Sequence, residues 1–130
     1  NINYKLKLPP LDTTFVSMNV ILIEWVIENI CKNAIDAMSG KGDITIEVTA
    51  EKRNVVIDIT DTGIGIPKSK WKAIFRPGVS TKQKGWGLGL SLAERIVKRM
   101  HGGKVFVKRS VPDKETTFRV ILRKQAKLSI

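Results

Sequence analysis

Two asparagines, Asn29 and Asn33, are four residues apart in a stretch of the chain that has helical periodicity. Residues at this spacing share one face of an α-helix. The neutral amide oxygen of Asn33 is suited to one site on a hard divalent cation whose other ligands are water and substrate phosphates. Taken alone, the pair fits a solvated helix face better than a metal site.

A second candidate is the stretch Asp61–Pro67, which reads Asp-Thr-Gly-Ile-Gly-Ile-Pro and follows a predicted strand. The carboxylate of Asp61 only accepts hydrogen bonds, and Gly63 and Gly65 allow another group to approach the backbone closely. Such a stretch can hold a flat ligand that donates a hydrogen bond, such as an adenine amino group. Ordinary turns also contain Asp and Gly, so this stretch alone is weak evidence.

The third candidate is the glycine-rich run Gly85–Leu90, which leads directly into a predicted helix. Backbone N–H groups and the positive end of the helix dipole suit a di- or triphosphate, and Lys82 and Lys84 precede the run. The run matches neither the common phosphate loop nor the dinucleotide fingerprint. Taken alone, it also fits a flexible hinge.

Thr116 is the fourth candidate, because it shares the predicted core face of the last strand with Phe118, Val120 and Leu122. A hydroxyl on an apolar face needs a hydrogen-bond partner. Asp61, or a water bound to it, would serve. A nearby backbone group is the alternative partner.

Hydrophobic periodicity predicts the elements that position these residues. In chain order they are an extended segment over 1–14 with a short strand at Tyr4–Leu8, a helix from Asn19 to about Met38, a hairpin of strands Ile44–Ala50 and Val55–Ile59, a glycine-rich loop with a short helix at Lys68–Ile74, a helix over Leu88–Met100, and strands Lys104–Arg109 and Thr116–Arg123. This order favours an α+β fold, a two-layer α/β sandwich with one mixed sheet of about five strands and about three helices on one face.

Composition limits the class of protein. A chain of 130 residues with 42% hydrophobic residues is the size of one domain, and its longest apolar run, Val20–Ile23, is too short to cross a membrane. The net charge of +11 would attract phosphates, so a nucleic-acid-binding module is an alternative, although few aromatic residues interleave the basic ones. Cys31 has no partner for a disulfide, which favours a reducing cytoplasm.

In this order, the four candidates resemble the ATP-binding catalytic domain of bacterial sensor histidine kinases, a branch of the superfamily that includes type II topoisomerase, heat-shock chaperone and mismatch-repair ATPases. Asn29–Asp36 is similar to the N box of that family and Asp61–Pro67 to its first glycine box. Ile74–Lys82 is similar to its F box and lid, and Gly85–Ser91 to its second glycine box. The resemblance extends over most of the chain and implies one ATP-binding domain over 1–130, of the Bergerat type, with a lid at about 75–85.

The resemblance also implies ATP and Mg²⁺ as cofactors. Asn33 would bind Mg²⁺, Asp61 would recognise adenine, and Asn29, Asn33 and Lys82 would act in catalysis. The remaining nucleotide contacts would come from Gly63, Gly65, Ile66, Lys84, Gly85, Trp86, Gly87, Leu88, Gly89, Leu90 and Thr116.

One position separates the branches of this superfamily. Its ATP-hydrolysing members have a glutamate four residues before the metal asparagine, where this chain has Asn29. Without a carboxylate there, direct attack by water is disfavoured, and phosphoryl transfer to a protein acceptor fits better. The only histidine, His101, is followed by glycine at a predicted helix end and suits a helix cap better than a phosphate acceptor.

We therefore expect a fragment of a protein-histidine kinase whose acceptor histidine is on a dimerisation hairpin that precedes this segment. Its expected partners are that hairpin and, through it, a cognate response regulator, with no nucleic acid. The parent is expected to be a cytoplasmic or membrane-bound homodimer and the isolated domain a monomer. An anti-sigma-type serine kinase, which shares the same boxes, is the alternative within the enzymes.

Overall fold

The structure, a computed structural model, describes residues 2–8, 20–77, 89–100 and 102–123. The described elements, in chain order, are β1 (Ile2–Lys7), α1 (Val20–Ala37), β2 (Gly42–Ala50), β3 (Asn54–Asp61), the 3-10 turns η1 (Lys68–Lys70) and η2 (Ala73–Phe75), α2 (Gly89–Arg95), the π-helical turn η3 (Ile96–Met100), β4 (Lys104–Val111) and β5 (Glu115–Arg123).

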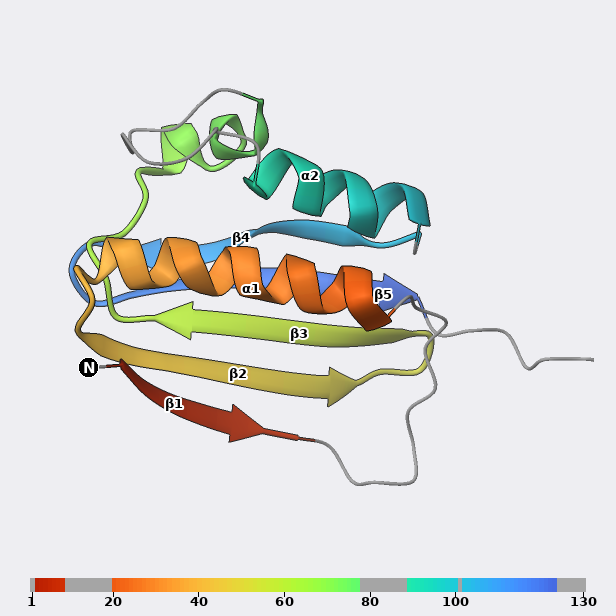
Figure 1. Cartoon of the computed structure of the whole chain (residues 1–130), viewed down its shortest axis with the longest axis horizontal. Helices are drawn as coiled ribbons and strands as arrows, with labels where there is room; N and C mark the ends of the chain where they lie inside the picture. The colour runs from red at the N-terminus through yellow and green to blue at the C-terminus, as the bar shows by residue number, and fades with distance from the viewer. Residues whose placement is uncertain (1, 9–19, 78–88, 101, 124–130) are drawn as a thin grey trace, which may run out of the picture.

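The five strands form one mixed sheet in the order β1-β2-β3-β5-β4. β1 is parallel to β2, and every other neighbouring pair is antiparallel. β3 and β5 therefore lie in the interior of the sheet, with a strand on each side. Figure 1 shows that β3 and α1 both end, and β5 begins, at the same end of the molecule.

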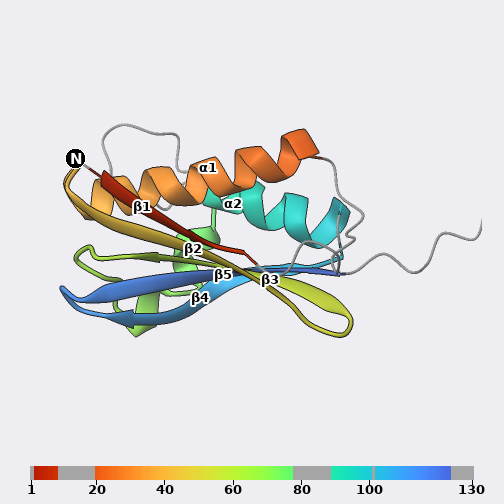
Figure 2. The ribbon, with the colours of Figure 1, turned by 90° about the horizontal axis from the view of Figure 1, so that it is seen from below.

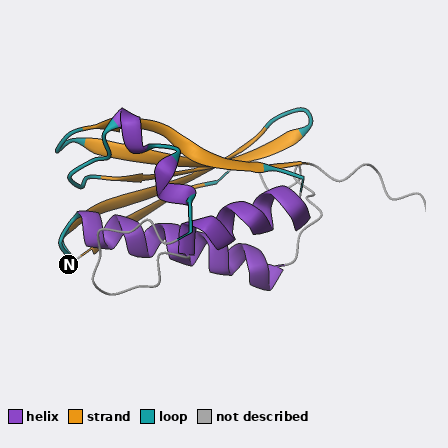
Figure 3. Cartoon of the chain, turned by 90° about the horizontal axis from the view of Figure 1, so that it is seen from above, coloured by secondary structure: helices purple, strands orange, loops and turns teal. Residues whose placement is uncertain are grey.

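Helices α1 and α2 cover one face of the sheet, and no helix of the described residues lies on the other face (Figures 2 and 3). α1 buries Val26, Ile30 and Ala34, whose three- and four-residue spacing makes one apolar stripe. The stripe packs on alternate residues of the central strands, such as Ile59 and Val120. The two-layer α+β sandwich with a five-stranded mixed sheet is therefore confirmed.

The predicted elements agree with the observed ones in type and order, and two details differ. The short helix expected at Lys68–Ile74 is a pair of 3-10 turns. The second helix changes from α to π winding at Ile96, before the chain turns back at Gly102. The helix cap expected at Asn19 is outside the described residues.

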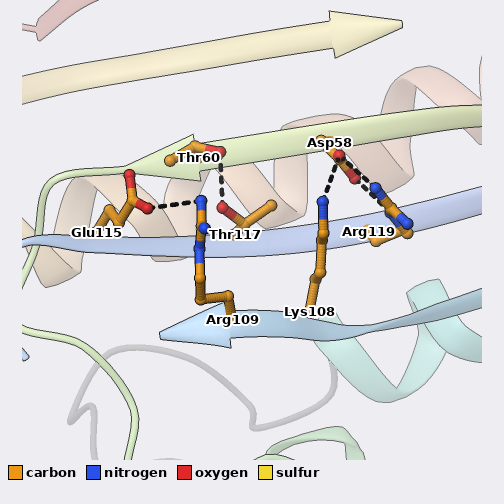
Figure 4. Close-up of polar contacts among 7 residues, drawn as sticks. All are labelled: Asp58, Thr60, Lys108, Arg109, Glu115, Thr117 and Arg119. Atoms are coloured by element: carbon orange, nitrogen blue, oxygen red, sulfur yellow. Dashed lines mark hydrogen bonds and ion pairs between the residues drawn. The ribbon is translucent and has the colours of Figure 1, made fainter. Parts of the chain in front are cut away.

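The face of the sheet away from the helices carries a group of polar side chains that are paired with one another (Figure 4). The guanidinium of Arg119 donates two hydrogen bonds of 2.8 Å to the carboxylate of Asp58, and the Lys108 ammonium lies 3.6 Å from the same carboxylate. Beside them, the hydroxyls of Thr60 and Thr117 are 2.8 Å apart. These contacts tie β3, β5 and β4 together on the side away from the helices.

A β-bulge in β4 falls between Val107 and Arg109. A bulge inserts one extra residue, so the strand resumes with the opposite alternation. Lys108 and Arg109 consequently lie on the same, helix-free face, where Lys108 meets Asp58 and Arg109 forms an ion pair with Glu115 (Figure 4). The next residue, Ser110, is returned to the face that carries the helices.

Candidate nucleotide-binding site

Asp61 ends β3 on the helix-covered face and is 3% exposed. One of its carboxylate oxygens accepts a hydrogen bond of 2.8 Å from the backbone N–H of Gly63. Burial raises the pKa of Asp61 above its ordinary value, and the Gly63 N–H offsets part of that rise. The second carboxylate oxygen, Oδ2, is the one left to bind a donor, and an ionised acceptor in a water-poor site binds a donor strongly.

The loop after Asp61 is held against the end of α1. The backbone N–H of Ile64 donates to the carbonyl of Ala37 at 3.1 Å, and the carbonyl of Ile64 accepts from the N–H of Asp113 at 3.2 Å. A Cβ atom on Gly63 would lie 2.8 Å from the carbonyl carbon and oxygen of Ala37. Gly63 is therefore required for the approach of this loop to α1, whereas the sequence suggested an approach to the ligand.

The loop is also held by two side chains from other elements. The hydroxyl of Ser110 on β4 accepts a hydrogen bond of 2.8 Å from the N–H of Ile66. The indole N–H of Trp71, between the two 3-10 turns, donates to the carbonyl of Ile66 at 2.8 Å. Gly65, between these anchors, has a φ of 92°, which only glycine adopts without strain. The loop is thus fixed on both sides before any ligand binds.

The side chains of both asparagines of α1 donate to a backbone carbonyl four residues earlier in the helix. The side-chain amide of Asn29 donates to the carbonyl of Trp25 at 2.8 Å, and that of Asn33 donates to the carbonyl of Asn29 at 2.9 Å. Each amide nitrogen points to the carbonyl of the preceding turn, so each amide oxygen points away from that carbonyl. The Asn29 oxygen lies against α2, because a Cβ atom on Gly89 would be only 2.7 Å from it. The structure thereby brings together the first and the third of the predicted site segments.

Thr116 lies opposite Asp61 in the β3–β5 ladder and is 2% exposed. Its hydroxyl is 2.7 Å from the hydroxyl of Ser110. The sequence suggested Asp61, a water bound to it, or a backbone group as the partner of Thr116, and the side chain of Ser110 is a partner that the sequence analysis did not name. Ser110 reaches Thr116 because the bulge in β4 reverses the alternation of the strand, which would otherwise direct Ser110 to the other face of the sheet.

Comparison with known proteins identifies the family. Residues 18–126 match the family described as histidine kinase-, DNA gyrase B-, and HSP90-like ATPase. This chain belongs to that family. The domain is accordingly an ATP-binding domain, and the fold and family expected from the sequence are confirmed.

Individual members give the same result. Sporulation kinase C of Bacillus subtilis (strain 168) is 40% identical over 100 residues, which are 77% of this chain and 23% of that protein. The catalytic domain of histidine kinase ThkA, in a nucleotide-free form, superposes with a TM-score of 0.83 at 28% identity and covers 96% of this chain and 82% of that one. ThkA in complex with response regulator protein TrrA matches with a TM-score of 0.78 at 25% identity, over 95% of this chain and 34% of that chain. The chain thus spans about a quarter of the length of the curated kinase.

Several predicted site residues of this ATPase domain lie outside the described residues: Lys82, Lys84, Gly85, Trp86, Gly87 and Leu88. His101 lies outside them as well. Leu90 and Ile66 are half-buried and pack against the core. No helix among residues 20–77 and 89–100 is long and apolar enough to span a membrane.

Sequence reasoning missed Ser110 and the anchoring role of Trp71. A signal for Ser110 was available, because Lys108 and Arg109 are adjacent cations and neither is suited to the core face of a strand. Two such residues in succession indicate a bulge. For Trp71 the sequence offers no comparable signal, since its contact depends on how the 3-10 turns fold back on the loop.

Proposed function

We propose that this chain binds Mg-ATP and donates the γ-phosphoryl group to a histidine on a separate dimerisation hairpin of a parent sensor histidine kinase, in two-component signal transduction. The observation that carries the proposal is the buried carboxylate of Asp61, held beside a glycine loop that is already fixed, in a domain of this ATPase family. Membership of the family supports ATP as the nucleotide.

The adenine base is assigned to Asp61. Its Oδ1 is occupied by the Gly63 N–H, so Oδ2 would accept the 6-amino group of the base. The opposed residue Thr116 supplies a hydroxyl on the same face of the sheet. The four backbone hydrogen bonds of Ile64 and Ile66 keep this edge of the site in place, so that little ordering entropy is lost when the base binds.

The magnesium ion is assigned to Asn33. An amide oxygen is a ligand that Mg²⁺ accepts, and Mg²⁺ commonly takes its other ligands from water and substrate phosphates. The described part of the chain contains no group of three or more His, Cys, Asp or Glu residues that would hold a metal by itself. The residues present therefore fit a metal ion that binds together with ATP and neutralises charge on its phosphates.

Asn29 supports transfer to a protein acceptor over hydrolysis. Its amide nitrogen donates to Trp25 and its oxygen lies against Gly89, and an amide cannot take a proton from water as a carboxylate does. The adjacent Glu28 is exposed on the outer side of α1. We therefore assign neither residue the role of general base in hydrolysis.

In the proposed reaction, a nitrogen of the acceptor imidazole attacks the γ-phosphorus in line. The N–P bond forms as the bond from that phosphorus to the β,γ-bridging oxygen breaks, and ADP leaves. The lid cations Lys82 and Lys84, or Arg76 on the described side of the lid, would neutralise the phosphates. The Gly85–Gly89 stretch would supply backbone donors to them.

The remaining assignments concern the parent protein. We assign the domain to the cytoplasm, as a monomer when isolated and as part of a homodimer in the parent. ThkA, a structural neighbour, has been solved with a response regulator. We extend that kind of partner to this chain, through the dimerisation hairpin.

Incubation with γ-labelled ATP tests the proposal. Alone, the chain should bind Mg-ATP without appreciable hydrolysis or self-labelling. Supplied with the histidine-bearing hairpin of its parent, it should transfer acid-labile label to the hairpin. Acid-stable label on a hydroxyl would favour the serine-kinase alternative, and rapid phosphate release by the chain alone would refute the argument from Asn29.

A further inference from the structure

A short chain of hydrogen bonds runs from the glycine loop to the residue opposite Asp61. The N–H of Ile66 donates to the hydroxyl oxygen of Ser110 at 2.8 Å, and that hydroxyl is 2.7 Å from the hydroxyl of Thr116. Thr116 is the direct partner of Asp61 in the β3–β5 ladder. Ser110 therefore contacts the loop and Thr116 at once.

The bulge of β4 makes this arrangement possible. Without the extra residue between Val107 and Arg109, the alternation of the strand would place Ser110 on the helix-free face. With the bulge, Ser110 faces Thr116 across the β4–β5 pair. Because of this one inserted residue, Lys108 and Arg109 lie together on the face away from the helices, and the hydroxyl of Ser110 lies on the helix-covered face.

Each hydroxyl has one hydrogen to donate, and this limits the direction in which the series of hydrogen bonds can run. The oxygen of Ser110 already accepts from Ile66, and a hydroxyl that accepts becomes a better donor through its own hydrogen. Within the described residues, Thr116 is the other partner that Ser110 has. The favoured orientation runs from Ile66 through Ser110 to Thr116, which leaves the Thr116 hydrogen directed onward.

We propose that Ser110 is a positioning residue that holds Thr116 as a hydrogen-bond donor toward the nucleobase and thereby determines base selectivity. This inference rests on the proposed function, in which the base lies against Asp61. An acceptor at Asp61 beside a donor at Thr116 complements a base edge that presents an amino group next to an unprotonated ring nitrogen, as adenine does. Hypoxanthine and guanine present a carbonyl next to a ring N–H, which is the reverse pattern.

The experiment measures binding of the full chain by calorimetry to ATP, to 1-deaza-ATP and to purine riboside triphosphate. 1-deaza-ATP keeps the amino group and lacks the ring nitrogen N1, whereas purine riboside triphosphate keeps N1 and lacks the amino group. Wild type should prefer ATP over 1-deaza-ATP by about fivefold, the effect of one ordinary hydrogen bond. Ser110→Ala should bring that ratio close to one and leave the preference over purine riboside triphosphate in place, whereas Ser110→Thr, which keeps the hydroxyl, should restore the first ratio.

Thr117→Val is the matched control, because it removes a hydroxyl from a pair of similar length, Thr60–Thr117, on the other face of the sheet (Figure 4). It should leave both ratios unchanged. A folded Ser110→Ala variant with the wild-type ratio would overturn the proposal. So would a wild type that fails to distinguish 1-deaza-ATP from ATP, which needs no variant to fold. Absence of ATP binding by wild type would instead refute the proposed function itself.

Discussion

β3 carries two aspartates on opposite faces of the sheet, and their carboxyl pKa values are shifted in opposite directions. The guanidinium of Arg119 holds the pKa of Asp58 below its ordinary value of 3.8, with a smaller contribution from Lys108. Burial raises the pKa of Asp61 above the same value. Ionised Asp58 therefore stabilises the fold, whereas ionised Asp61 is disfavoured by it. A carboxylate kept at such a cost is expected to be used by a ligand.

Replacing Asp61 by Asn should separate stability from binding. The amide oxygen can keep the hydrogen bond from the Gly63 N–H, which directs the amide NH₂ to the position of Oδ2. There it would face the 6-amino group of adenine, donor against donor. An unmade buried hydrogen bond costs about 1–3 kcal/mol, so ATP affinity should fall about 5–150-fold. The free energy of unfolding without nucleotide should stay equal or rise, because the buried charge is gone.

Calorimetric titration with ATP and thermal unfolding without it measure the two quantities. In wild type, the Asp61 contribution to the free energy of unfolding falls as pH rises from 3.8 through the raised pKa, and this fall should be absent from Asp61→Asn. The matched control is Asp58→Asn, with opposite signs: it should lose stability at neutral pH and keep its ATP affinity. Unchanged affinity in folded Asp61→Asn would refute the assignment of this carboxylate to the base.

Three other changes test the surroundings of the site. Gly63→Ala should lower the free energy of unfolding by about 1–3 kcal/mol, because its Cβ would lie 2.8 Å from the Ala37 carbonyl, and a thermal melt with the wild-type midpoint would contradict that contact. Asn33→Ala should weaken ATP binding measured with Mg²⁺ more than binding measured in EDTA, whereas an equal loss would make Asn33 structural. Trp71→Phe should cost about 1 kcal/mol of stability by leaving the Ile66 carbonyl without its indole donor, as denaturant titration would show.

The sequence was sufficient for the order of elements because that order depends on repeated local patterns, and for the family because four short motifs occur in the expected order. The periodicity of α1 and the alternation of β2, β3 and β5 recur over many residues, so one irregular position does not change the result. The placement of Asp61 at a strand end also followed from the alternation. These features needed no knowledge of which strands are neighbours.

The contacts of the site could not be predicted in the same way, because they join elements that are distant in the chain. The Ser110–Thr116 hydroxyl pair depends on a bulge that reverses the alternation of β4. The role of Gly63 depends on where α1 ends relative to the loop. In both cases, a shift of one residue in the alignment of two elements changes which side chains are in contact. Local sequence patterns carry no information on that alignment.

The candidate site has two parts that differ in how they are held. On the base side, Asp61 and its loop are fixed by hydrogen bonds to α1, to β4 and to Trp71 before ligand binds. On the proposed phosphate side, the amide oxygen of Asn29 on α1 lies against Gly89 at the start of α2. Changes on the base side should therefore act on nucleotide affinity and base choice. Changes in α1 should act on the position of α2 relative to the nucleotide, and so on metal dependence and phosphoryl transfer.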